Sequence, residues 1–144
     1  MRLFSQDAKV QALRRAPLFE DLSGAELAQL ARVTEDVEVP AGQVLCREGE
    51  IGREFFVIID GEAAVSRRGR HLATQRGGDF FGEISLLENI PRTATVTART
   101  PLRFFVLTGR DFRRLLDQTR TVERKVLRAL ARRVLAISRD PTLA

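Results

Sequence analysis

The feature that most constrains the fold is a succession of short apolar segments separated by turns, most of which contain glycine. These segments are rich in β-branched and aromatic residues, which is typical of strands. Asp60-Gly61 has the composition of a β-hairpin turn, which makes 62–66 the returning strand. The pattern predicts a mainly β architecture, a sandwich or roll, rather than a parallel α/β sheet. The predicted strands are 37–39, 44–46, 54–59, 62–66, 71–75, 93–98 and 102–107.

Both ends of the chain have helical patterns instead. Ser23 followed by Glu26 forms a capping box, and a short helix is expected to end before Pro17. Thr108 is a second capping signal, ahead of a helix with Phe112 on its apolar face. We therefore expect one domain over 1–144, with N-terminal helices in 1–34, a β-roll in 35–108 and two closing helices in 109–139. The apolar stripe of the last helix is Val122, Val126, Leu130, Val134 and Ile137.

Composition limits the class of protein further. The chain of 144 residues is 44% hydrophobic and 30% charged, which is typical of a globular domain. Its longest strongly apolar run is 55–59, too short to span a bilayer, and the N-terminus lacks the apolar stretch of a signal peptide. We therefore expect a cytoplasmic protein without a transmembrane segment. Cys46 is the only cysteine, so an intramolecular disulfide is excluded.

The stretch 80–96, FFGEISLLENIPRTATV, combines free backbone amides, a cation and a carboxylate acceptor in one short segment. Gly82 permits close approach of the backbone, and the helix that 83–88 can form offers free amide groups at its start. Pro91 stops that helix, and Arg92 follows with a guanidinium suited to one phosphate charge. Glu83 is an acceptor when ionised, so it can accept a hydrogen bond from a sugar hydroxyl.

These residues resemble the phosphate-binding cassette of the cyclic nucleotide-binding domain family. The matching motifs are Phe81-Gly82-Glu83-Ile84-Ser85-Leu86 and Pro91-Arg92-Thr93-Ala94-Thr95-Val96, together with the spacing between Glu83 and Arg92. The segment 42–61 and the helices at both ends also fall where the family has them. The resemblance implies an eight-stranded jelly roll that binds cyclic AMP (cAMP) or cyclic GMP (cGMP), with a cassette over 81–95.

The resemblance also implies a role for each residue of the cassette. Glu83 would accept a hydrogen bond from the ribose 2′-hydroxyl, and Arg92 would pair with the cyclic phosphate. Gly82, Ile84, Ser85 and Thr93 would complete the phosphate shell. The last helix would close over the base with Leu127, Leu130 and Ala131. The output would be a shift of the closing helices, acting on a separate effector protein or in a homodimer.

Other interpretations remain open at this point. The same fold can serve as a non-binding scaffold or an oligomerisation module. The net charge of +5 and the row Arg124, Arg128 and Arg132 leave room for nucleic-acid or membrane-surface binding. No helix-turn-helix follows the last helix, so we expect no DNA-binding domain. With His71 as its only histidine, the chain offers neither a metal-binding jelly roll nor a catalytic triad, so we expect no metal, no cofactor and no enzyme activity.

Overall fold

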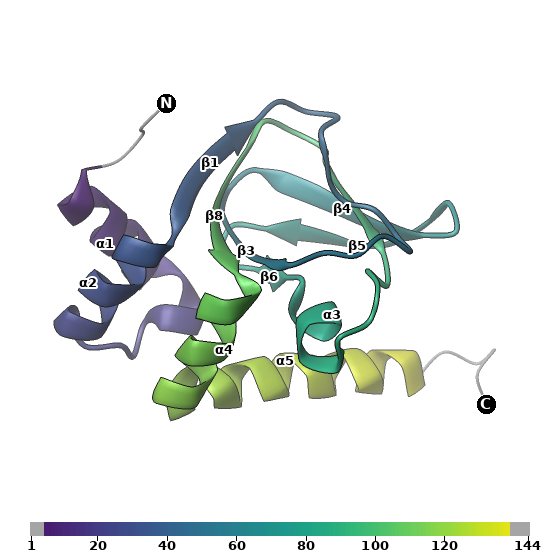
Figure 1. The fold of residues 1–144 in the computed structure, drawn as a ribbon. Coiled ribbons are helices and arrows are strands. Elements are labelled where there is room, and N and C mark those ends of the chain that lie inside the picture. Colours follow the sequence, from purple (N-terminus) through teal and green to yellow (C-terminus); the bar gives the residue numbers. More distant parts are fainter. Residues whose placement is uncertain (1–4, 139–144) are drawn as a thin grey trace.

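The computed structural model describes residues 5–138, with side-chain environments for 5–132. At its centre lies a roll of eight strands in two antiparallel sheets, with helices before and after it (Figure 1). The first sheet has the order β1-β8-β3-β6, and the second has the order β2-β7-β4-β5. The predicted eight-stranded jelly roll is therefore confirmed. The strands are β1 (Glu35–Val39), β2 (Val44–Cys46), β3 (Glu54–Asp60), β4 (Glu62–Arg67), β5 (Arg70–Arg76), β6 (Phe80–Phe81), β7 (Thr95–Ala98) and β8 (Leu102–Thr108).

The predicted helix starts are also confirmed. The Ser23 hydroxyl accepts a hydrogen bond from the Glu26 amide, and the Glu26 carboxylate accepts one from the Ser23 amide. Thr108 caps the next long helix by accepting from the Asp111 amide at 3.1 Å. The helices are α1 (Gln6–Arg15), the 3-10 helix η1 (Pro17–Phe19), α2 (Gly24–Val33), α3 (Glu83–Glu88), α4 (Gly109–Gln118) and α5 (Arg120–Ser138).

Three pairs of adjacent phenylalanines show why the first sheet is buried on both faces. The pairs lie on β3, β6 and β8, which are neighbours in that sheet. Successive side chains of a strand point to opposite faces, so each pair places one ring inside the roll and one against the helices. The rings against the helices include Phe55, which stacks on Phe112 of α4 with ring centroids 4.2 Å apart. The inner rings are Phe56, Phe81 and Phe104, and the outer rings are Phe55, Phe80 and Phe105.

The predicted hairpin at Asp60-Gly61 is wrong, because the chain crosses there from one sheet to the other. β3 pairs with β6 and β8, whereas β4 pairs with β5 and β7. Gly61 has a φ of 98°, and a Cβ at this position would overlap the backbone carbonyl of Pro101. A turn is present as predicted, but local composition does not specify which strand becomes the next neighbour.

The structure differs from two of the strand expectations around the cassette. The predicted strand 93–98 begins only at Thr95, because the backbone at Arg92 pairs with Gly49 and Glu50 instead of joining the sheet. The strand β6 was not predicted, since two residues are too few to show an alternating pattern. α3 lies at the end of the roll, between β6 and β7 in the chain (Figure 1).

Candidate functional site

The short helix α3 is held between two left-handed residues. Gly82 precedes it with φ 99°, and Asn89 ends it with φ 55°. A Cβ on Gly82 would lie 2.8 Å from the Glu54 carbonyl oxygen and 2.9 Å from Nη1 of Arg92. Glycine is therefore required here both for its backbone conformation and for the close approach of the arginine.

The Arg92 side chain lies against the start of α3 and is only 6% exposed. Its Nη1 donates to the Ser85 hydroxyl at 2.8 Å and to the Gly82 carbonyl at 3.2 Å, and its Nη2 donates to the Glu54 carbonyl at 2.7 Å. The guanidinium carbon is 5.8 Å from the centre of the Phe56 ring. A buried cation is costly unless it is hydrogen-bonded, and these contacts fix both its position and its orientation.

Gly52 is a further determinant of this geometry, and sequence reasoning missed it. A Cβ at this position would overlap the Nε and Cζ atoms of Arg92. The residue has no left-handed φ, so its backbone does not require glycine. Glycine is required at this position because the Arg92 guanidinium packs directly against the Gly52 backbone. Gly52 lies forty residues from Arg92 in the sequence, which is too far for a local pattern to reveal the contact.

The turn before β3 is fastened to the cassette through the backbone. The Gly49 amide donates to the Arg92 carbonyl at 2.9 Å, and the Arg92 amide donates to the Glu50 carbonyl at 2.8 Å. The Glu48 amide donates to the Thr95 hydroxyl at 3.0 Å. These bonds join the two segments, 42–61 and 81–95, in which the sequence resembles the family.

The other predicted cassette residues occupy distinct environments. Glu83 is fully buried and Ser85 is 5% exposed, on the first turn of α3. Ile84 is partly buried, whereas Thr93 is exposed. The structure thus brings Gly82, Ser85 and Arg92 into direct contact and buries Glu83 beside Gly82 in the chain. Thr93 shows no side-chain hydrogen bond within the described residues.

The three residues of the predicted base lid differ in their exposure to solvent. Leu130 packs at the edge of the apolar core between the roll and the helices. Leu127 is 58% exposed, and Ala131 is exposed. The side chains of Val134 and Ile137, which continue the predicted stripe, lie outside the part described. Val122 and Val126 are buried as predicted.

A direct contact links the cassette helix to the closing helices. Arg113 of α4 donates from Nη2 to the Leu86 carbonyl of α3 at 3.1 Å. Leu86 is 4% exposed, and a Cβ on Gly109 would lie 3.0 Å from its Cδ2 atom. A hydrogen bond and tight packing therefore connect α3 to the start of α4.

Cys46 behaves as a small apolar residue in the core of the roll. Burial raises the pKa of its thiol to about 11, although the Arg92 guanidinium opposes this rise and Glu54 adds to it. At neutral pH the thiol is protonated, and it is not a nucleophile. Within residues 5–138 no cluster of three or more histidine, cysteine or acidic residues is arranged to hold a metal ion.

The segment between β6 and β7 thus carries two buried charged side chains, Glu83 at the start of α3 and Arg92 four residues after its end. The model of the cyclic nucleotide-binding domain matches residues 36–119. The chain belongs to the cyclic nucleotide-binding domain family, as the sequence predicted.

Known relatives agree with this assignment. A cAMP-dependent protein kinase regulatory subunit of Eremothecium gossypii is 44% identical over 108 residues, which are 72% of this chain and 23% of that protein. A cyclic nucleotide-gated potassium channel of Rhizobium etli is 36% identical over 124 residues, which are 85% of this chain and 35% of that protein. The chain therefore spans roughly a quarter to a third of the length of these relatives.

Solved structures share the fold over nearly the whole chain. The cAMP-bound PfPKA-R structure has a TM-score of 0.80 and 27% identity, and the match covers 95% of this chain and 49% of that one. The catabolite activator protein of Thermus thermophilus has a TM-score of 0.77 and 25% identity, covering 88% and 62%. In the part of the chain with described structure, none of the helices has the length and apolar character needed to cross a bilayer.

Proposed function

We propose that this domain is a cyclic nucleotide sensor in which Arg92 binds the cyclic phosphate and Glu83 binds the ribose. The observation that carries the proposal is the burial of both side chains in the segment between β6 and β7, with the guanidinium held by Gly82, Ser85 and Glu54. These bonds use three of the five N–H donors of Arg92, so donors remain for a phosphate. The family and the cAMP-bound PfPKA-R neighbour support this ligand class.

Calorimetric titration with cAMP and with cGMP tests the proposal directly. We expect saturable one-site binding of at least one of them. A ligand at 100 times its dissociation constant stabilises the folded state by about 2.7 kcal/mol, so the same ligand is expected to raise the melting temperature. AMP, which lacks the cyclic diester, serves as the control. Absence of both heat and thermal shift with either cyclic nucleotide would favour the non-binding scaffold instead.

Glu83→Gln tests the ribose contact, because the variant keeps the shape of the side chain and removes its charge. We expect cAMP affinity to fall by about tenfold or more, since a hydrogen bond to a charged group contributes about 1.5–3 kcal/mol. The matched ligand is 2′-deoxy-cAMP, which lacks the hydroxyl that Glu83 would bind. If the two groups contact each other, the losses from variant and ligand are not additive. Full additivity of the two losses would contradict the ribose assignment.

The regulatory part of the proposal concerns the closing helices. When the cyclic phosphate binds, α3 moves toward it and displaces Leu86. The Leu86 carbonyl accepts a hydrogen bond from Arg113, and its side chain packs against Gly109 at the start of α4. Such a switch operates only if the ligand binds one helix arrangement more tightly than the other. Movement of α4 and α5 then becomes the output, read by a separate effector protein or by a second copy of the chain. The proposal assigns no catalytic residue.

A further inference from the structure

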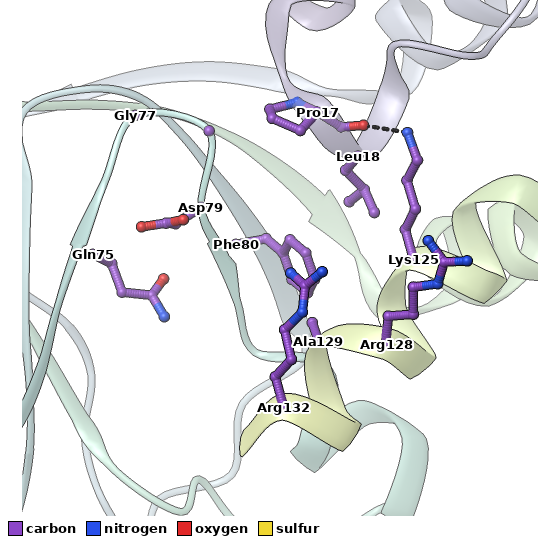
Figure 2. A pocket seen from close by; sticks show the side chains of 11 residues that line it. Pro17, Leu18, Gln75, Gly77, Asp79, Phe80, Lys125, Arg128, Ala129 and Arg132 are labelled. Carbon is purple, nitrogen blue, oxygen red and sulfur yellow. Dashed lines mark hydrogen bonds between the residues drawn. The ribbon is translucent and has the colours of Figure 1, made fainter. Parts of the chain in front are cut away.

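A separate pocket lies between the last helix and the turn that joins β5 to β6 (Figure 2). Its volume is about 420 Å³. Small-molecule pockets span roughly 300–1,000 Å³, so it has the size for a ligand. Residues of η1, of the turn and of α5 line it, whereas Glu83 and Arg92 do not. The three residues of the predicted base lid, Leu127, Leu130 and Ala131, do not line this pocket either. We call it the α5 pocket.

One wall of the α5 pocket is cationic. Arg128 and Arg132 lie one helical turn apart on α5, and their side chains extend toward the space above the helix (Figure 2). Lys125 also lines the pocket, but its ammonium donates to the Pro17 carbonyl and pairs with Asp21 at 2.9 Å. Neither arginine makes a hydrogen bond or ion pair within the residues whose side chains are described. Because like charges one turn apart repel, an anion shared by both is favourable.

The opposite wall presents hydrogen-bond acceptors. Asp79 is held in place because its Oδ2 accepts from the Arg76 amide at 2.8 Å. The Gln75 side-chain oxygen is buried and accepts no hydrogen bond within the described part of the chain. Both side chains come from the β5–β6 region and lie across the pocket from Arg132 (Figure 2). Acceptors of this kind suit hydroxyl or amino groups of a ligand.

An apolar surface connects the two walls. Leu18 of η1, Phe80 of β6 and Ala129 of α5 all line the pocket. Phe80 is partly buried and contributes an aromatic ring to the lining of the pocket (Figure 2). A planar aromatic body in the ligand would pack on this ring, as aromatic groups do at small-molecule sites. The pocket therefore combines two guanidinium groups, two acceptors and an apolar face.

We propose that the α5 pocket binds a nucleoside 5′-diphosphate as a second ligand, distinct from the cyclic nucleotide of the cassette. Arg128 and Arg132 hold the two phosphoryl groups, which matches two guanidinium groups to two anionic groups. Asp79 and Gln75 accept hydrogen bonds from the sugar hydroxyls, and Phe80 packs against the base. Because the ligand touches η1, the roll and α5 at once, it ties the last helix to the rest of the domain.

The test is calorimetric titration of the whole chain with ADP and with inorganic pyrophosphate. We expect ADP to bind more tightly than pyrophosphate, because only ADP offers hydroxyls and a planar base. The double variant Arg128→Gln/Arg132→Gln is expected to weaken ADP binding by about tenfold or more. The matched control is Arg120→Gln/Arg124→Gln, which removes the same charge from exposed positions of α5 outside the pocket and changes affinity by about twofold or less.

Two further variants separate this site from the cassette and from nonspecific attraction. Arg92→Ala leaves ADP affinity unchanged if the α5 pocket is the site, and this holds whether or not the cassette binds cyclic nucleotide. Asp79→Asn keeps an acceptor for the Arg76 amide and is expected to weaken ADP but not pyrophosphate. The proposal is overturned by the absence of ADP binding at about 5 mM. It is also overturned by equal losses in the two double variants, or by loss of ADP binding in an Arg92→Ala protein that thermal melts show to be folded.

Discussion

Replacement of Arg92 by alanine is expected to abolish cyclic nucleotide binding at micromolar concentrations. Truncating one side of a buried charge pair costs roughly 2–5 kcal/mol, which corresponds to about a thirtyfold to several-thousandfold loss of affinity. The large effect follows from burial. Arg92 is 6% exposed, so its pair with the phosphate would be shielded from solvent. Calorimetric titration with cAMP and cGMP measures the loss, and undiminished affinity in the variant would refute the assignment.

The Arg92→Ala variant needs a control for stability, because the side chain also donates to Gly82, Ser85 and Glu54. Ser85→Ala removes one of these bonds but leaves the guanidinium in place. We expect Ser85→Ala to weaken binding much less than Arg92→Ala does, because the guanidinium and its bonds to the Gly82 and Glu54 carbonyls remain. Arg92→Lys keeps the charge but loses the planar fork, so an intermediate loss is expected. Thermal melts show whether each variant is folded at the temperature of titration.

Gly52→Ala is expected to weaken cyclic nucleotide binding by about tenfold or more, although residue 52 contributes no side chain to the site. The added methyl group would overlap the Nε and Cζ atoms of Arg92, so the guanidinium must leave its position. Its bonds to the Glu54 and Gly82 carbonyls and the Ser85 hydroxyl are then strained or lost. The expected decrease in the free energy of unfolding is about 1–3 kcal/mol.

Gly24→Ala is the matched control for this prediction. A Cβ at Gly24 meets nothing within 4 Å, and the residue lies in the first turn of α2. The change should leave both affinity and stability nearly unaltered, or raise stability slightly through reduced entropy of the unfolded chain. A Gly52→Ala protein with wild-type affinity would show that the observed place of the guanidinium is not needed for binding.

The extent to which the sequence predicted the site differs between its parts. Glu83, Ser85 and Arg92 lie within ten positions of one another, so a motif with fixed spacing identified them together. Gly52 and Arg113 were missed because each acts across the fold, the first by leaving space for Arg92 and the second through the Leu86 carbonyl. Neither residue type stands out locally in a chain with ten glycines and many arginines. The α5 pocket was likewise not predicted, since three distant segments form it.

The sequence by itself determined most of the strands, the capped helices and the family, because those signals depend on residues that are neighbours along the chain. The alternation of short apolar segments with turns, and the capping box at Ser23, require no knowledge of what packs against them. Only the tertiary structure decided that Asp60-Gly61 carries the chain between sheets, and that the paired phenylalanines bury both faces of one sheet. The physical reason is that pairing partners and shared space are chosen by the packing of segments far apart in sequence, which local composition does not encode.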